Sequence, residues 1–349
     1  MFYYDNIIPN SIKVASFISI YPAILRENTL FMTNNSPIQL IEHDLFKQRQ
    51  ITVQIKRDDL IHPIISGNKW RKLKYNLIHA KKNNKTSVLS FGGAYSNHIH
   101  ALAFACYQQG LTSLGIIRGE AHYANNFTLT WAQRWGMKLI FVDRKTYKKR
   151  NQQDYLQQLQ AQFPQSFIVP EGGSNELALP GMSEVIDELN QQTQFDSLLC
   201  PVGSGGTLAG LIMGDKNQHN LLGIAVLKQG MANKHYLEDE VKALLPASAK
   251  HYDNWRIEGN MHRGGYGKFT LQDLQRILAF SQQTNIPFEP IYSGKMVLAL
   301  LDLIEQDYFP AGHKIVMLHT GGLQGLGGLS ERQLINAKQW NLPPKAPNN

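Results

Sequence analysis

Apolar and polar residues follow two periods along this chain, and the two periods alternate. Thr52 to Ile55 has the two-residue period of a strand, and apolar residues then recur with helical spacing at Trp70, Leu73 and Leu77. Further strands are expected at residues 87–91, 113–117, 138–142, 167–169, 198–202, 223–227 and 314–318, and further helices at residues 99–107, 125–135, 147–162, 182–189 and 296–304. Repeated βα units of this size predict an α/β fold with parallel sheets covered by helices on both faces.

Length and composition fit a globular protein with a large core. The chain has 349 residues, of which 43% are hydrophobic and 18% are charged, which is not the composition of a disordered chain. This length suggests two domains. We expect residues 1–35 to form an irregular N-terminal extension, and residues 343–349, which hold three prolines, to form a loose tail.

The formal net charge of +8 is concentrated in two basic stretches, Lys69–Lys85 and Arg144–Arg150. Neither stretch lies near a sequence signature of DNA or RNA binding. Charge alone shows only an electrostatic tendency, so a solvated basic surface is expected and nucleic acid is not expected as a partner.

The two cysteines and the apolar runs limit the compartment. Cys106 and Cys200 lie in apolar surroundings without CxxC or Cys/His spacing, so we expect no disulfide framework and no metal site. Residues 17–25 are too few to span a bilayer, and no basic region precedes an apolar one at the N-terminus. A reducing, cytoplasmic location without membrane contact is therefore predicted.

Lys69 stands where a glycine-containing loop, Ser66 to Asn68, turns into the first predicted helix. The partial positive charge of a helix start disfavours an ammonium, and desolvation lowers the pKa of a lysine further. Such a lysine can be a neutral, nucleophilic amine. The alternative is a solvated lysine that begins a basic helix face, since further basic residues follow it.

Two glycine-containing turns supply candidate anion sites. Gly92-Gly93 closes a strand, and Ser96 is a plausible N-cap of the next helix. The free N–H groups at the start of this helix either bind an anion such as a carboxylate or are simply capped by Ser96. Gly203 to Thr207 joins a strand to a helix and resembles a phosphate-binding turn, although a plain turn remains the alternative. It is neither a Walker loop nor a GxGxxG motif, and the next strand ends in Lys228 where a dinucleotide site needs an acid. A phosphate on a smaller cofactor is therefore expected.

Six motifs in this order resemble pyridoxal-5′-phosphate enzymes of the group that contains 1-aminocyclopropane-1-carboxylate deaminase and D-cysteine desulfhydrase. The resemblance covers about residues 36–330, and its motifs are Lys56–Asp59, Gly67–Lys69, Gly92–His98, Gly203–Gly210, Pro290–Lys295 and His319–Gly322. It implies the tryptophan-synthase-β-like fold of fold type II, with two open, twisted parallel-sheet domains and the cofactor in the cleft between them. The larger domain is expected from residues 36–75 with 190–342, the smaller from residues 76–189, and the protein as a homodimer.

The resemblance implies a cofactor role for several residues. Lys69 is expected to form the Schiff base with pyridoxal 5′-phosphate and to move the α-proton of the substrate. Asn97 is expected to meet the 3′-oxygen of the cofactor, Tyr292 to stack on or beside the pyridine ring, and Thr320 to meet the pyridine nitrogen. The phosphate is expected on the loop formed by Gly203, Ser204, Gly205, Gly206 and Thr207.

The resemblance also implies a substrate side. Ser96, with Asn97 and His98, is expected to bind the carboxylate region of a small amino acid, and Tyr266 to line the pocket. Family members usually have glutamine at the position of Tyr95 and often arginine at that of His100. A bulkier Tyr95 beside the substrate loop could change the accepted side chain.

Two positions separate the subgroups of the family. The cyclopropane deaminases have a glutamate and a leucine where this chain has Ser293 and Thr320, which is the desulfhydrase-like pair. A neutral hydroxyl leaves the pyridine nitrogen largely unprotonated and suits β-elimination better than ring opening. We therefore expect a lyase that converts D-cysteine or a similar β-substituted amino acid to pyruvate, ammonia and sulfide. The alternatives are a ring-opening deaminase and a pyridoxal-phosphate-binding protein without turnover.

Overall fold

The computed structural model describes residues 35–230 and 233–346. Residues 1–34 of the expected N-terminal extension, and residues 347–349 of the expected tail, lie outside the described residues. The helices and strands predicted from the apolar spacing are present, mostly with ends one to three residues away from the predicted ones.

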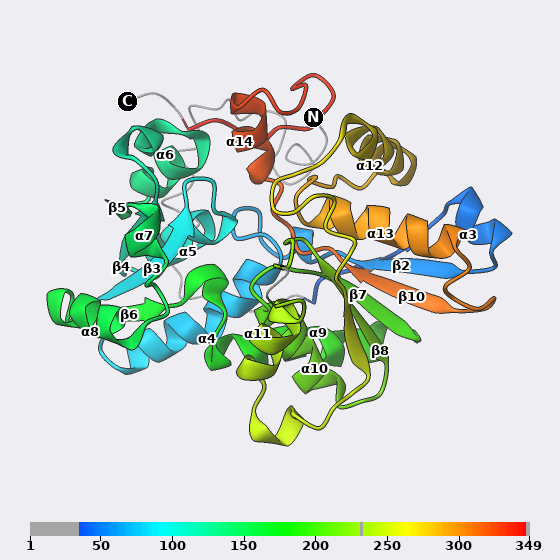
Figure 1. Ribbon diagram of the computed structural model, residues 1–349, viewed down its shortest axis with the longest axis horizontal. Helices are drawn as coiled ribbons and strands as arrows, with labels where there is room; N and C mark the ends of the chain where they lie inside the picture. The colour runs from blue at the N-terminus through cyan, green and yellow to red at the C-terminus, as the bar shows by residue number, and fades with distance from the viewer. Residues whose placement is uncertain (1–34, 231–232, 347–349) are drawn as a thin grey trace.

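A six-stranded sheet forms the larger half of the molecule (Figure 1). Its order is β1-β2-β10-β7-β8-β9, and all neighbouring strands are parallel except for β1, an antiparallel edge strand that the sequence did not predict. The strands are β1 (Ile38–Ile41), β2 (Thr52–Lys56), β7 (Ser197–Val202), β8 (Asn220–Ala225), β9 (Trp255–Glu258) and β10 (Lys314–Leu318).

A second sheet of four parallel strands has the order β5-β4-β3-β6. It lies beside the first, on the left of Figure 1. Its strands are β3 (Ser87–Gly93), β4 (Thr112–Arg118), β5 (Lys138–Val142) and β6 (Ser166–Val169).

Helices cover both faces of the larger sheet, because alternate residues of its strands point to opposite sides. In β10, Ile315 and Met317 pack in one core cluster with α3, α12 and α13, whereas Val316 and Leu318 pack in another with α9, α10 and α11. Figure 1 shows α12 and α13 on one face and α9 and α10 on the other. These helices are α3 (Asp44–Gln48), α9 (Leu179–Gln192), α10 (Gly206–Asp215), α11 (Tyr236–Leu244), α12 (Leu271–Thr284) and α13 (Ser293–Glu305).

Helices also cover both faces of the smaller sheet. One of its cores joins Val88 and Ile117 to α4, α5 and α6, and the other joins Leu89 and Phe91 to α7 and α8. The remaining helices are α4 (Asn68–Lys82), α5 (Asn97–Gln108), α6 (Phe127–Arg134), α7 (Arg144–Tyr147), α8 (Gln153–Gln162) and α14 (Gly325–Glu331). This arrangement confirms the predicted fold class, an α/β protein with two parallel-sheet units.

The single helix predicted for residues 147–162 is wrong. Two helices, α7 and α8, replace it, and residues 148–152 between them form a turn. The side chain of Asp143 accepts hydrogen bonds from the N–H groups of Lys145 and Thr146, so α7 begins earlier than expected. Residues 148–152 are all polar and offer no apolar side chain that would hold a continuous helix on the sheet.

A buried group of four charges ties α4 to its surroundings. The Arg71 guanidinium lies 2.7 Å from Asp58, which follows β2, and 2.8 Å from Glu188 on α9. The Lys56 ammonium lies 2.5 Å from the second oxygen of Glu188. All four side chains are buried, and their charges sum to zero, so the burial cost is offset by close pairing.

We expect Arg71→Met to lower the free energy of unfolding by about 3–5 kcal/mol, because it leaves the buried Asp58 without its ion-pair partner and Glu188 with Lys56 alone. Chemical denaturation followed by circular dichroism measures this loss. The matched control is Arg276→Met, which removes a guanidinium from a partly exposed network with Asp302 and Glu305 and is expected to cost less than about 1 kcal/mol. Equal losses in the two variants would contradict the anchoring role of Arg71.

Candidate active site

The start of α4 and the end of β10 meet in direct contact. Gly67 has a φ of 69°, and a β-carbon built on it would lie 1.9 Å from the carbonyl oxygen of Thr320. Only glycine allows both this conformation and this approach. The N–H of Asn68 donates to the same carbonyl at 3.4 Å. The predicted lysine motif and the predicted threonine motif, 250 residues apart, therefore lie side by side.

Lys69 lies one side chain away from the predicted phosphate turn. Its amine donates to the side-chain oxygen of Asn68 at 3.2 Å, and the Asn68 amide nitrogen donates to the hydroxyl of Thr207 at 2.8 Å. Desolvation lowers the pKa of Lys69 from 10.5 to about 8. A considerable fraction of this amine is therefore neutral near physiological pH, as a nucleophile requires.

The turn from Gly203 to Thr207 is a compact cradle of small residues and hydroxyls. Gly205, with a φ of 76°, precedes α10. The N–H of Gly206 donates to the carbonyl of Ser204 at 2.9 Å, and the next N–H groups, those of Thr207 and Leu208, have no acceptor within the helix. The Ser204 hydroxyl lies 2.6 Å from that of Ser174, which comes from the loop after β6. A β-carbon on Gly206 would lie 2.6 Å from the Ser174 hydroxyl and 3.0 Å from the Lys72 amine.

The sequence reasoning assigned no role to Lys72 or Ser174. The Lys72 amine donates to the Ser174 hydroxyl at 2.6 Å, and the side chain of Lys72 is buried. Desolvation, and then the charge of Lys69, lower its pKa well below the usual value. Within residues 35–230 and 233–346, no carboxylate lies within ion-pair distance of this amine. The available signal was the spacing, since residues three apart share one face of a helix.

The predicted substrate loop begins α5 and packs against the end of β10. Ser96 is the N-cap, as predicted, and its hydroxyl accepts the N–H of Ile99 at 3.3 Å. A β-carbon on Gly322 would lie 2.8 Å from the amide nitrogen of Asn97, so this loop and the glycines after Thr320 are in contact. The His98 ring is buried and reaches the Ser90 hydroxyl at 2.8 Å, inside β3.

Tyr292 and Tyr266 form an aromatic pair beside the cradle. Their rings are 5.9 Å apart at 70°, and their hydroxyls are 3.4 Å apart. A β-carbon on Gly203 would lie 3.3 Å from the Tyr292 ring, which places this ring against the phosphate turn. Tyr292 is partly buried, and Tyr266 is 47% exposed.

The hydroxyl of Ser293 is engaged by Glu289. It accepts the N–H of Glu289 at 3.1 Å and donates to the Glu289 carboxylate at 3.1 Å. The same carboxylate accepts the N–H groups of Tyr292 and Ser293 at 2.9 and 2.7 Å and so caps α13. The side chain of the desulfhydrase-like Ser293 is thus turned toward the start of its own helix. Of the pair Ser293 and Thr320, only the Thr320 side chain, which is nearly buried, lies at the end of β10.

The two residues that depart from the family pattern are packed into different surroundings. The Tyr95 ring lies 4.3 Å under the guanidinium of Arg332 and against Gly328 of α14. His100 is buried edge-on against Trp135 at 4.8 Å. Tyr95 therefore couples the substrate loop to α14, whereas His100 belongs to the core of the smaller half.

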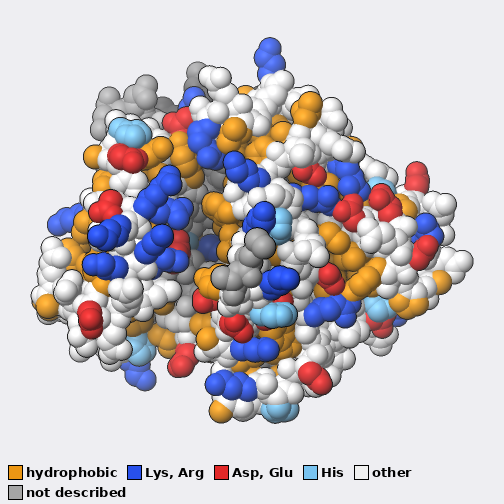
Figure 2. Space-filling view, viewed as in Figure 1, with side chains coloured by type: hydrophobic (Ala, Val, Ile, Leu, Met, Phe, Trp, Pro, Cys, Tyr) orange, Lys and Arg blue, Asp and Glu red, His pale blue; other side chains and the backbone are white. Residues whose placement is uncertain are grey.

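The parts of this site suit a small phosphorylated aldehyde. A buried ammonium and three hydroxyls gather at a helix start, which is a donor set for a phosphate dianion. An amine with a lowered pKa lies next to them, and an aromatic ring forms a wall. Figure 2 shows that the surface is hollowed between the two halves, with Lys and Arg side chains gathered on the side of the smaller sheet.

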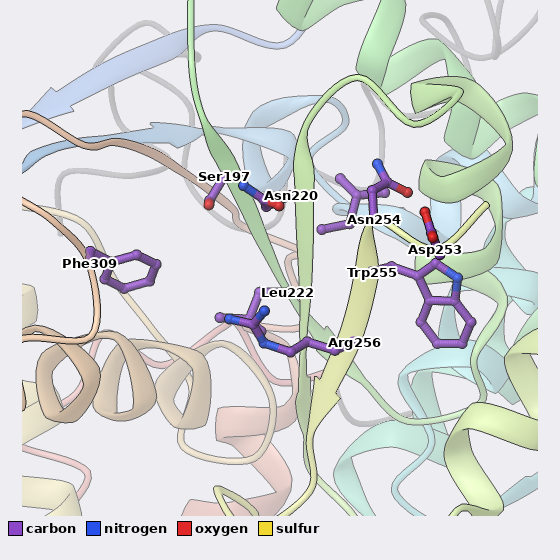
Figure 3. A pocket seen from close by; sticks show the side chains of 9 residues that line it. Ser197, Asn220, Leu222, Asp253, Asn254, Trp255, Arg256 and Phe309 are labelled. Atoms are coloured by element: carbon purple, nitrogen blue, oxygen red, sulfur yellow. The ribbon is translucent and has the colours of Figure 1, made fainter.

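A second hollow lies away from these residues. It is a cavity of about 220 Å³ at the amino ends of β7, β8 and β9 (Figure 3), the opposite edge of the sheet from the cradle. It is lined by Ser197, Asn220, Leu221, Leu222, Asp253, Asn254, Trp255, Arg256 and Phe309. None of the residues predicted for the site lines this cavity.

Two further findings concern metals and membranes. In the part of the chain that the structure describes, no group of three His, Cys, Asp or Glu side chains is placed to hold a metal ion. Each helix of that part is too short or too polar to cross a lipid bilayer. Cys106 and Cys200 are free thiols in the core.

Fold and site together define an α/β protein in which a partly buried lysine of lowered pKa lies near a glycine-rich turn, an arrangement suited to a phosphorylated cofactor. The family model described as pyridoxal-phosphate dependent enzyme matches residues 33–321. The chain therefore belongs to the family of pyridoxal-phosphate-dependent enzymes. The predicted cofactor and the predicted family resemblance are confirmed.

Relatives carry the names of both subgroups. The chain is 28% identical, over 83% of its length and 90% of the other, to a putative 1-aminocyclopropane-1-carboxylate deaminase of Pyrococcus horikoshii. It is 26% identical to a D-cysteine desulfhydrase of Serratia proteamaculans, over 78% of its length and 87% of the other. The crystal structure of a homologue of 1-aminocyclopropane-1-carboxylate deaminase matches with a TM-score of 0.73 and 27% identity, over 87% of this chain and 94% of that one.

We expect Lys69 of the cofactor-free protein to react with an amine-selective acylating reagent with a half-maximal rate near pH 8, because burial disfavours its charged form. Mass spectrometry of the peptide that holds Lys69 measures the rate at each pH. The same peptide in urea-unfolded protein is the control, and its half-maximum is expected at about pH 10.4. A half-maximum above pH 10 in the folded protein would contradict the desolvated amine.

Proposed function

We propose that this protein is a lyase that eliminates the β-substituent of D-cysteine or a similar small amino acid, giving pyruvate, ammonia and sulfide. One observation carries the proposal: the Lys69 amine and the Thr207 hydroxyl of the glycine cradle are bridged by a single side chain, Asn68. This spacing suits one small cofactor held at both ends. Relatives named as D-cysteine desulfhydrases, and the pair Ser293 and Thr320, support elimination.

The proposed cofactor contacts follow from the positions of the residues. The phosphate would lie on the N–H groups and hydroxyls of the Gly203–Thr207 turn, with Lys72 and Ser174 as further donors. Lys69 would hold the cofactor aldehyde covalently. Asn97 would meet the 3′-oxygen of the cofactor, Tyr292 would stack on or beside the pyridine ring, and Thr320 would meet the pyridine nitrogen. When bound, pyridoxal phosphate supplies an aldehyde that joins amines and a ring that withdraws electrons.

Each protein group has one task in the reaction that we propose. Ser96 and Asn97, at the start of α5, bind the carboxylate of the substrate, with His98 behind them and Tyr266 along the pocket wall. Once the amine of the substrate has replaced it on the aldehyde, the freed Lys69 amine would take the α-proton. The bond between the β-carbon and sulfur then breaks, and the sulfur leaves with the electron pair. Water completes the release of pyruvate and ammonia.

Ring-opening deamination of a cyclopropane amino acid is the second candidate, because several relatives are named for it. The engagement of Ser293 by Glu289 disfavours it, since the Glu289 carboxylate is held by the start of α13 and is not available to favour protonation of the pyridine nitrogen. A cofactor-binding protein without turnover is the third, suggested by the departures at Tyr95 and His100. We further propose a cytoplasmic homodimer, with the domain boundaries predicted at residues 75–76 and 189–190.

Gly206→Ala is expected to weaken cofactor binding at least about tenfold, because the new methyl group enters the space between Ser174 and Lys72. Titration of the cofactor-free protein with pyridoxal phosphate, followed by near-visible absorbance, measures the affinity. Gly230→Ala is the matched control, since a β-carbon there meets no atom of the described residues within 4 Å. Wild-type affinity in Gly206→Ala would argue against a phosphate at this turn.

Lys69→Ala is expected to abolish both turnover and the near-visible absorbance of the bound cofactor. A panel of D- and L-cysteine, other β-substituted amino acids and 1-aminocyclopropane-1-carboxylate, assayed for sulfide and 2-oxo acid, tests the reaction. Release of sulfide from D-cysteine by the wild type supports the proposal. Turnover of the cyclopropane substrate alone favours the second candidate, and no turnover of any compound favours the third.

A further inference from the structure

Lys295 is a buried lysine to which the proposed reaction gives no role. It lies in the first turn of α13 and is 0% exposed. Its ammonium donates to the carbonyl oxygens of Gly265 at 2.6 Å and Val226 at 3.3 Å. Among the described residues, no carboxylate comes within ion-pair distance of it. Its direct partners are therefore main-chain carbonyls, which is a costly environment for a buried charge.

The charged groups around Lys295 offset part of this cost from a distance. Burial lowers its pKa to about 8, whereas the carboxylates of Glu289 and Asp273 raise it and the guanidinium of Arg263 lowers it. Burial, and then the charge of the same ammonium, lower the pKa of His262. An apolar side chain at this position would avoid the desolvation cost altogether. The presence of a lysine is therefore explained by the segments whose carbonyls it binds.

The held segment is a glycine loop with little structure of its own. Gly264, Gly265 and Gly267 all have positive φ, at 88°, 110° and 65°. Two turn bonds close the loop: Gly265 N–H to the His262 carbonyl at 3.0 Å, and Lys268 N–H to the Gly265 carbonyl at 3.1 Å. Glycines in this region have wide conformational freedom, so fixing the loop needs an outside contact.

The contact connects the two tyrosines of the candidate site. Lys295 lies three residues after Tyr292 in α13, and the Gly265 carbonyl that it binds belongs to the residue before Tyr266. A bond between these two points sets the distance between the helix that carries one ring and the loop that carries the other. The hydroxyls of the two rings lie 3.4 Å apart.

We propose that Lys295 is a positioning residue: its ammonium fixes the Gly265 carbonyl and thereby holds Tyr266 beside Tyr292 on the substrate side of the site. This inference rests on the proposed function only where substrate kinetics are concerned. A charge-assisted bond to a carbonyl is stronger than a neutral one, which is why a lysine serves here.

The first test is hydrogen exchange of Lys295→Met, a variant of similar shape without donors. The amides of Gly265 and Lys268 are expected to exchange about tenfold faster than in the wild type, because the shared carbonyl is released. Lys228→Met is the matched control: its side chain packs 3.2 Å from a β-carbon built on Gly265, but it is exposed and makes no such bond. Unchanged exchange in folded Lys295→Met would overturn the proposal.

The second test uses kinetics of the cofactor-loaded enzyme. Lys295→Met is expected to raise KM for the amino-acid substrate about tenfold or more, with a smaller change in kcat and with the near-visible absorbance of the bound cofactor retained. Lys228→Met should leave both constants near the wild-type values. Faster loop exchange with an unchanged KM would overturn the link between Lys295 and the substrate.

A measurement on the wild type covers the case in which Lys295→Met does not fold. Raising the pH through about 8 removes the proton from Lys295 and weakens its bonds. The protection of the Gly265 and Lys268 amides, corrected for base catalysis, should fall between pH 7 and 9, while amides in β7 keep theirs. Constant loop protection over that range would refute the proposal. This arm needs no turnover, so its result stands even if the proposed lyase activity fails.

Discussion

The pairing of Arg71 with Asp58 and Glu188 fixes the helix on which the rest of the site depends. These charges are buried, and they are tolerated because each one meets its opposite at hydrogen-bond distance. Lys69 and Lys72 lie on the same helix, two residues before Arg71 and one residue after it. Their directions follow from the anchored register of α4, so a buried ion-pair network sets where the two amines of the proposed site lie.

The charge balance of the site explains why it suits an anion. Lys69 and Lys72 are close enough for the charge of one to lower the pKa of the other, and burial lowers both. The carboxylate of Glu289 is occupied by the N–H groups at the start of α13. A phosphate dianion on the glycine cradle would raise the pKa of both amines and favour their charged forms.

Local patterns predicted much of the fold. The strand spacing around Val53, the cap at Ser96 and the glycine turn at Gly203 each depend on neighbours in sequence, and the structure has all three as predicted. The helix predicted for residues 147–162 was wrong, since spacing alone does not show where a helix loses contact with its sheet. The short edge strands β1 and β9 were missed.

By itself, the sequence determined the alternation of strands and helices, the family and a lysine suited to a pyridoxal cofactor. These follow from residue types at fixed spacings. Only the tertiary structure decided that Lys72 and Ser174 join the cradle, that Ser293 turns toward Glu289, and that Lys295 holds the loop of Tyr266. Each of these depends on a contact between distant segments, and the direction of a side chain is set by the packing around it.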